Sequence, residues 1–278
     1  MSAAQVKPSP EGVPGALLDP ATIDAQEITY MGAGATEIAG YLARPSSPHP
    51  AGALSRLPGM IVIHEAGGLG EHIRDVTNRI ANLGYVALAP DLYTREGGPP
   101  PAGDLEALFE RLFSMPDERV LGDLEGAAEQ LAARPDQSGR IGCIGFCMGG
   151  RYTLLYACTR QRLNAAVDCW GGFVDTATPD ERATATRPIP PLELAEQLGC
   201  PLLAAVGAED HNPSPEVGER LRARAARSTQ PVRVDVYEGA GHAFFADYRP
   251  SYRQRPAALL WERLVPFLAE HLGGHDGA

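Results

Sequence analysis

The hexapeptide Gly-Phe-Cys-Met-Gly-Gly at residues 145–150 is the most informative part of this sequence. It follows a short apolar run, Arg-Ile-Gly-Cys-Ile at 140–144, and it opens a pattern with helical periodicity. This order predicts a tight corner between a strand and a helix, with Cys147 at its centre. Such a corner strains its central residue and leaves no room for flanking side chains, which explains the glycines. Cys147 is therefore expected to act as a nucleophile.

Alternating signals for strands and helices surround this corner. An antiparallel hairpin is expected first, with strands over residues 27–30 and 37–43. The runs expected to form parallel strands are 60–64, 85–89, 140–144, 165–170, 202–206 and 233–237. The expected helices are 73–83, one or two within 105–133 with a break near 115–117, 148–158, 192–198, 216–227 and 257–272. The alternation predicts the α/β class, an α/β-hydrolase fold with a mostly parallel central sheet flanked by helices on both faces.

Length and composition predict one domain. The chain has 278 residues, of which 44% are hydrophobic, enough to bury a large core. Residues 1–25 are rich in Pro, Gly and Ala and are predicted to form an N-terminal arm, so the domain spans 26–278. The N-terminus lacks the features of a signal peptide, and no apolar run reaches membrane-spanning length. We therefore expect a cytoplasmic protein.

The net charge argues against nucleic acid and anionic membranes as partners, and the cysteines indicate the redox compartment. The net charge is −11 and the pI is near 5.1, so nucleic acid and anionic membranes would be repelled at long range. Five cysteines occur without Cys-x-x-Cys spacing, and four lie in apolar patterns, which indicates buried thiols in a reducing compartment. We expect no metal, no cofactor, and a monomer or small homo-oligomer.

Two loops that follow predicted strands complete a candidate catalytic set with Cys147. Asp210 lies in the loop 207–213, and His242 lies in the loop 239–243. Because loops at the carboxyl ends of parallel strands form the site in such folds, these side chains are expected to meet. Cys147 would attack a carbonyl, His242 would take up and return the proton, and Asp210 would fix the imidazole tautomer. The chain order nucleophile, acid, histidine is the one that this fold uses.

Each assignment has a competing interpretation. A cysteine in an apolar context is usually a buried hydrophobic residue, which is our interpretation of Cys143, Cys158, Cys169 and Cys200. His242 could be a loop histidine that is bonded locally, and Glu209 competes with Asp210. Asp210 fits better because it stands two places before an Asn-Pro turn. Two further histidines, His64 and His211, also fall in loops that face the predicted site.

Taken together, these residues resemble the dienelactone hydrolases, a cysteine branch of the α/β-hydrolases. The resemblance runs from about Glu37 to the C-terminal helix, and the motif at 145–150 is among its more specific features. It implies that Cys147, Asp210 and His242 form the triad. It also implies that Glu65, in His-Glu-Ala-Gly-Gly at 64–68, corresponds to a further glutamate near the nucleophile. Arg95, in Asp-Leu-Tyr-Thr-Arg at 91–95, corresponds to an arginine that helps to hold a substrate carboxylate.

Glu65 has a physical role beside this likeness. A carboxylate next to a thiol raises the pKa of the thiol, whereas a helix N-terminus and an imidazolium lower it, so the resting thiol could stay neutral. In the family the glutamate is thought to help activate the thiol when substrate arrives. The alternative is that Glu65 caps the helix that begins near Glu71. The oxyanion hole is expected to use the backbone N–H groups of Met148 and Ala66.

The resemblance is incomplete where substrate choice is decided. Family members that act on dienelactone carry a second arginine four residues beyond the catalytic histidine, and this chain has Ala246 there. Arg249 or Arg253 could replace it, or each could be a solvated surface charge. The segment 176–191 could be a lid over the site or a plain surface loop. The side chains expected to bind substrate are Arg95, Tyr93, Trp170 and Phe244. Trp170 could instead pack in the core.

The leading hypothesis is a cofactor-independent hydrolase that cleaves a small ester or lactone through a thioester on Cys147. The narrower hypothesis is hydrolysis of dienelactone to maleylacetate in aromatic degradation, which depends on the resemblance and on Arg95. The runner-up is a broader carboxylesterase for neutral short-chain esters. Two further possibilities are a ligand-binding relative without activity and a redox-sensing cysteine.

Overall fold

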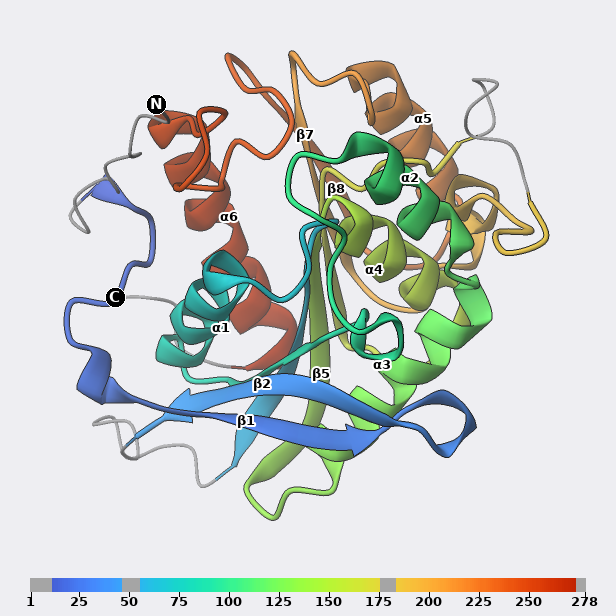
Figure 1. Ribbon diagram of the computed structural model, residues 1–278. Coiled ribbons are helices and arrows are strands. Elements are labelled where there is room, and N and C mark those ends of the chain that lie inside the picture. The colour runs from blue at the N-terminus through green and yellow to red at the C-terminus, as the bar shows by residue number, and fades with distance from the viewer. Residues whose placement is uncertain (1–11, 47–55, 176–183, 274–278) are drawn as a thin grey trace, which may run out of the picture.

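The computed structural model describes residues 12–46, 56–175 and 184–273. Eight strands form one sheet in the order β1-β2-β4-β3-β5-β6-β7-β8 (Figure 1). β1 pairs with β2, and β2 with β4, in antiparallel fashion, and every later pair is parallel. The strands are β1 (Ile23–Met31), β2 (Glu37–Pro45), β3 (Leu57–Ile63), β4 (Val86–Pro90), β5 (Gln137–Phe146), β6 (Ala165–Cys169), β7 (Leu202–Gly207) and β8 (Val232–Tyr237).

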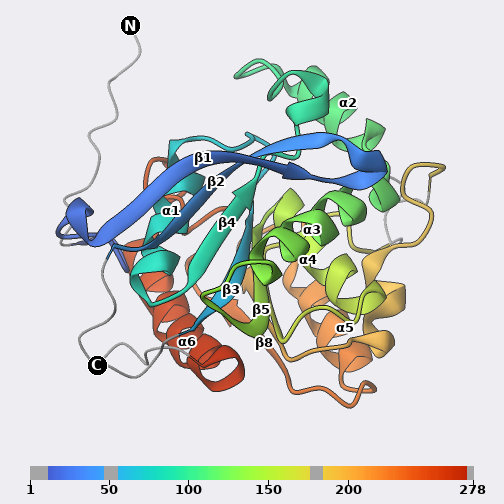
Figure 2. The ribbon, with the colours of Figure 1, turned by 90° about the horizontal axis from the view of Figure 1, so that it is seen from below.

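Helices cover both faces of the sheet (Figures 1 and 2). One face carries α1 (Glu71–Asn82) and α6 (Gln254–Leu272). The other carries α3 (Asp117–Ala132), α4 (Met148–Thr159) and α5 (Pro215–Ala225), with α2 (Leu105–Ser114) further out. Each face has its own apolar core, because the central strands are buried on both sides and alternate side chains point to opposite helical layers. The predicted α/β architecture with a mostly parallel sheet is confirmed.

The predicted elements differ from the observed ones mainly at their ends. The helical region 105–133 does break, because Pro116 stands between α2 and α3 in extended geometry. The segment predicted as an α-helix at 192–198 is instead a 3-10 helix, η6 (Pro191–Gln197). Pro190 and Pro191 at its start fix φ and remove N–H donors, and the segment is too short for regular α-helical bonding.

The predicted boundary of the N-terminal arm is three residues too late. β1 begins at Ile23, whose register partner is Pro45, so residues 23–25 belong to the sheet. The described part before it lies on α1 and α6. The Tyr252 hydroxyl donates to the Gly12 carbonyl over 3.0 Å, and Arg79 donates to the Pro14 carbonyl over 3.3 Å. Residues 1–11 of the predicted arm lie outside the described residues.

The parallel strands deliver their carboxyl ends to one edge of the sheet. β5 lies between β3 and β6, and the loops after these strands and after β7 and β8 meet at that edge. Within the described ranges, none of the helices has the length and apolar character needed to cross a bilayer.

Candidate active site

The corner between β5 and α4 holds Cys147 in strained geometry. Its φ is 54° and its ψ is −114°, and it is the N-cap residue of α4. A Cβ on Gly145 would overlap the carbonyl oxygen of Gly149, and a Cβ on Gly149 would overlap that of Ile63 in β3. Strand, helix and neighbouring strand thus approach too closely for any side chain. Cys147 is partly exposed, whereas the other four cysteines are buried.

His242 and Asp210 form a hydrogen-bonded pair beside this corner. The His242 Nδ1 lies 2.9 Å from Oδ2 of Asp210, and Oδ1 of Asp210 accepts from the Asn212 N–H over 3.0 Å. Asp210 is buried in the loop that follows β7. Because the carboxylate accepts from Nδ1–H, the Nε2 atom of the ring is free to receive a proton. Asp210 and His242 therefore have the relation predicted for an acid and a base.

The protonation of His242 depends on Cys147. Burial lowers the pKa of His242, but the hydrogen bond to Asp210 and the proximity of Cys147 outweigh it and raise the pKa to about 10. Asp210 and Cys147 therefore both act on this ring. A ring of this kind stabilises a neighbouring thiolate as an imidazolium.

The two predicted oxyanion-hole residues lie together. Ala66 and Met148 both line the cavity that contains Cys147. Met148 is the first residue of α4, so its N–H has no acceptor within the helix. The Tyr93 hydroxyl donates to the Ala66 carbonyl over 3.1 Å and lies 3.5 Å from the Met148 sulfur. Tyr93 therefore holds both residues in place.

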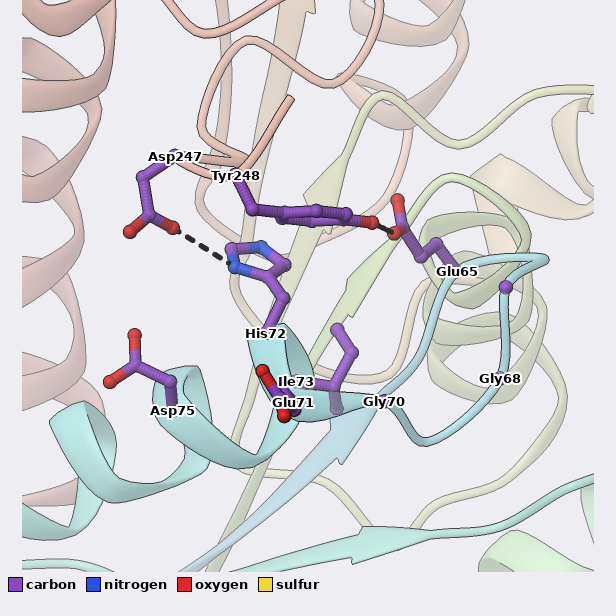
Figure 3. A pocket seen from close by; sticks show the side chains of 10 residues that line it. Glu65, Gly68, Gly70, Glu71, His72, Ile73, Asp75, Asp247 and Tyr248 are labelled. Carbon is purple, nitrogen blue, oxygen red and sulfur yellow. Dashed lines mark hydrogen bonds and ion pairs between the residues drawn. The ribbon is translucent and has the colours of Figure 1, made fainter. Parts of the chain in front are cut away.

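Glu65 faces the nucleophile's cavity but is bound to other side chains. Its Oε1 accepts from the Tyr248 hydroxyl and, over 2.7 Å, from Nη2 of Arg249. Figure 3 shows the Tyr248 hydroxyl directed at this carboxylate, with the His72 ring below the Tyr248 ring. The alternative that Glu65 caps α1 is wrong, because the N-cap residue is Gly70 and no side chain caps it. A second cavity of about 340 Å³ lies on the far side of Glu65.

The main cavity has a volume of about 830 Å³ and a mixed lining. Its floor carries Cys147, His242 and Asp210. One wall is apolar and comes from Leu105, Leu108, Phe109 and Leu112 of α2, together with Phe173. Three arginines also line the cavity, namely Arg151, Arg187 and Arg249. Such a cavity fits a small organic molecule with an apolar body.

The four side chains predicted to bind substrate do not line this cavity. Arg95 lies in the 3-10 helix η4 (Thr94–Glu96), where its Nη2 donates to Asp123 over 2.6 Å and to the Ala33 carbonyl over 2.8 Å. Its charge is paired with the buried Asp123 and it does not line the cavity, so this geometry gives no support to the predicted carboxylate clamp. Tyr93 is buried, and its hydroxyl donates a hydrogen bond to the Ala66 carbonyl instead of facing the cavity.

Trp170 and Phe244 were expected at the substrate, and this is wrong as well. Their rings lie 4.7 Å apart between centroids, and Trp170 also lies 5.7 Å from Phe146. Both are at most 2% exposed and belong to the apolar core on the α6 side of the sheet. The aromatic side chains near His242 therefore pack in the core and stabilise the loop that carries His242, and they do not line the cavity.

Among the other candidates, His64 is structural. Its Nδ1 lies 2.7 Å from the Glu65 carbonyl, and its Nε2 accepts from the Leu92 N–H over 3.1 Å, so the ring joins two loops. His211 lines the cavity, as expected. Arg249 lines it too, whereas Arg253 donates to the Pro250 and Tyr252 carbonyls outside it. Within the part of the chain that the structure describes, no cluster of His, Cys, Asp or Glu is arranged to hold a metal ion.

Sequence reasoning missed Arg151, Arg187 and the α2 wall. Arg151 stands one turn after Cys147 on α4, which is a signal that could have been used. Arg187 lies in the segment 176–191, where no local pattern indicates a binding residue. Only the described part of that segment, from residue 184, can be placed against the cavity.

The sheet order and the strained corner at its carboxyl edge define the class as an α/β-hydrolase. The chain belongs to the dienelactone hydrolase family, because a sequence model of the "Dienelactone hydrolase family" matches residues 38–272. It is a hydrolase of that family.

Individual relatives agree with this assignment. A Salmonella typhimurium protein named "Putative carboxymethylenebutenolidase" is 36% identical over 252 residues, which are 90% of this chain and 88% of that protein. A Bradyrhizobium protein named "Probable 2-oxo-3-(5-oxofuran-2-ylidene)propanoate lactonase" is 32% identical over 238 residues, 84% of this chain and 90% of that protein. The crystal structure of a "Putative Dienelactone Hydrolase" from Klebsiella pneumoniae has a TM-score of 0.80 and 35% identity, and covers 89% of this chain and 99% of its own.

Proposed function

We propose that this chain hydrolyses an ester or enol-lactone through a thioester on Cys147. The observation that carries the proposal is the His242–Asp210 hydrogen bond of 2.9 Å in a small-molecule cavity that Cys147 also lines. A thiol, a base and an orienting carboxylate in this relation suit acyl transfer.

The reaction would proceed in two steps. His242 takes the thiol proton, and the Cys147 sulfur attacks the carbonyl carbon while the Met148 and Ala66 N–H groups receive the negative oxygen. The tetrahedral adduct collapses, the carbon–oxygen bond breaks, and the leaving oxygen takes the proton from His242. Water then attacks the thioester, His242 accepts its proton and returns it to the departing sulfur, and the acid is released.

Glu65 would act when a charged substrate arrives. In the structure it is paired with Arg249, which also lines the cavity. A substrate carboxylate that binds Arg249 would compete with Glu65 and release it towards the thiol. Freed from Arg249, the Glu65 carboxylate would be able to accept the thiol proton itself, as a general base. This supports a carboxylate-bearing substrate even though Arg95 is engaged elsewhere.

An enol-lactone is the preferred substrate class. The name of the Bradyrhizobium relative denotes a five-membered enol-lactone that carries a carboxylate. Opening an enol-lactone releases an enol that becomes a ketone, a good leaving group for a thiolate adduct. Dienelactone, giving maleylacetate in aromatic degradation, remains the narrow form of the proposal. The apolar α2 wall favours the runner-up, a carboxylesterase for neutral esters.

The test is kcat/KM for dienelactone and for p-nitrophenyl acetate with wild type, Cys147→Ala and Cys147→Ser. Both substrates should lose turnover in the alanine variant, and the serine variant should keep only a trace, because a hydroxyl needs a stronger base than a thiol. Cys158→Ala is the matched control, since it removes a buried thiol from the same helix. A wild-type rate in Cys147→Ala would contradict the proposal, and a preference for p-nitrophenyl acetate would favour the esterase.

A further inference from the structure

Three arginines line the main cavity, and they differ in their partners. Arg151 makes two bonds to Asp117, of 2.6 Å and 3.0 Å, and Arg249 binds Glu65. Arg187 forms no ion pair with any residue that the structure describes. Its Nη2 donates to the Leu112 carbonyl, its Nε has no hydrogen-bond partner, and the residue is 5% exposed.

An unpaired charge in this position needs compensation. Burial lowers the pKa of Arg187, yet a guanidinium keeps its proton near neutral pH. The Phe113 ring, 4.8 Å from the guanidinium carbon, compensates only part of the charge. Because Asp117 is paired with Arg151, Arg187 has no carboxylate partner among the described residues, and its own charge stays unpaired. An anion in the cavity would balance it.

Arg187 is held in place by its own segment. The Thr186 hydroxyl donates to the Phe113 carbonyl over 2.8 Å, and the Asp117 N–H donates to the Thr186 carbonyl over 2.8 Å. These bonds fasten the segment to the end of α2 and the start of α3. A cation fixed in advance binds an anion without further ordering of the chain.

The shape of the guanidinium and the charges around it indicate the class of ligand. The planar guanidinium suits a carboxylate, and the carboxylates of Asp104, Glu209 and Asp210 in the same lining would repel a ligand with more than one negative charge. Arg187 lies next to Arg151, which stands one turn beyond Cys147 on α4, about 5 Å along the axis. The α2 wall with Leu108 and Leu112 lines the same cavity and would contact apolar atoms.

We propose that Arg187 binds the carboxylate of the substrate, so that the preferred substrate is a monocarboxylate whose apolar body lies along α2 and whose ester carbonyl reaches Cys147. This proposal rests on the proposed function and adds a subsite to it. Arg187 takes the place that the sequence assigned to Arg95.

The test compares two esters that differ only in charge, p-nitrophenyl hydrogen glutarate and its neutral amide, p-nitrophenyl 4-carbamoylbutanoate. Arg187→Gln should lower the ratio of kcat/KM for the acid to that for the amide by about tenfold or more, mainly through KM, with Arg187→Lys in between. The ratio does not depend on how much of a preparation is folded. Arg160→Gln, at the exposed end of α4, makes the same change in net charge and should leave the ratio unchanged within about twofold.

An unchanged ratio in Arg187→Gln and Arg187→Lys would overturn the proposal while leaving the hydrolase intact. If wild type cleaves neither ester, the proposed function fails, and Arg187 is then tested by binding alone. Pentanoate, but not pentanamide, should raise the melting temperature of wild type, and it should have no such effect on Arg187→Gln. A pentanoate shift that survives in Arg187→Gln would overturn the subsite.

Discussion

The five cysteines differ sharply in their chemistry although the sequence spaces them without a pattern. Burial raises the pKa of Cys143, Cys158 and Cys200 to about 12, and it also raises the pKa of Cys169 well above its ordinary value. These four thiols therefore stay protonated and protected at neutral pH. Cys147 alone is partly exposed, and it lines the same cavity as His242. A thiol reagent should react at this position first.

Asp168 gives the clearest pH dependence. Burial raises the pKa of this carboxyl to about 7 from an ordinary value of 3.8, although the Gly171 N–H donates to it and lowers the pKa in part. The folded state thus holds the proton more tightly than the unfolded chain. Stability from this group is complete below pH 3.8 and is lost as the pH rises through 7.

Asp168→Asn should therefore raise the melting temperature at pH 8 much more than at pH 5, because the amide keeps an acceptor for Gly171 and has no charge to bury. Thermal melts of wild type and variant across this range measure the difference. Glu238→Gln, on an exposed turn, is the control and should show no such trend. A difference that is constant with pH would contradict the raised pKa.

Among the elements, the 3-10 helix η4 carries Arg95, which makes a structural ion pair where the sequence predicted a contact with substrate. Arg95 joins η4 to α3 and to the turn after β1, because its partner Asp123 also accepts from the Ala33 N–H over 2.9 Å. Asp123 is 1% exposed, so this is a buried ion pair. The pair fastens the hairpin that begins the sheet to the helical layer.

Arg95→Ala should consequently destabilise the fold by about 3–5 kcal/mol, since it leaves the Asp123 carboxylate buried without its cation. Urea unfolding gives the free energy, and the double variant Arg95→Ala/Asp123→Asn should recover part of the loss. The preference for charged over neutral esters should stay as in wild type. A selective rise in KM for the charged ester, without loss of stability, would restore the clamp that the sequence predicted.

For the whole molecule, the net charge and the arginines in the cavity act on an anionic substrate in opposite directions. The net charge of −11 repels an anionic substrate at long range, while Arg187 and Arg249 attract it only within the cavity. Salt screens the long-range repulsion over about 10 Å at 0.1 M, and it screens buried contacts much less.

Raising the ionic strength from about 10 mM to about 150 mM should thus increase kcat/KM for the anionic glutarate ester and leave that for its neutral amide unchanged. Steady-state rates at fixed pH with a series of NaCl concentrations measure this. A rate for the anionic ester that falls with salt would mean that the local arginines dominate the encounter. Oligomeric state and compartment stay predictions.

The sequence by itself determined the parts that local physics controls. The glycines at 145 and 149, the apolar runs and the order of Cys147, Asp210 and His242 each depend on backbone sterics or on the regular alternation of strands and helices. For that reason the fold class, the corner and the loops that carry the candidate triad could all be inferred before any contact was known.

Only the tertiary structure decided which side chains face the cavity. Arg95 is engaged because Asp123, 28 residues away, is buried beside it, and Trp170 and Phe244 belong to a core formed by α6. Arg187 reaches the cavity because Thr186 is bonded to the end of α2. Long-range partners set the direction and the charge balance of a side chain, and no local pattern records them. The corner that carries Cys147 could thus be predicted, but the side chains that line the cavity could not.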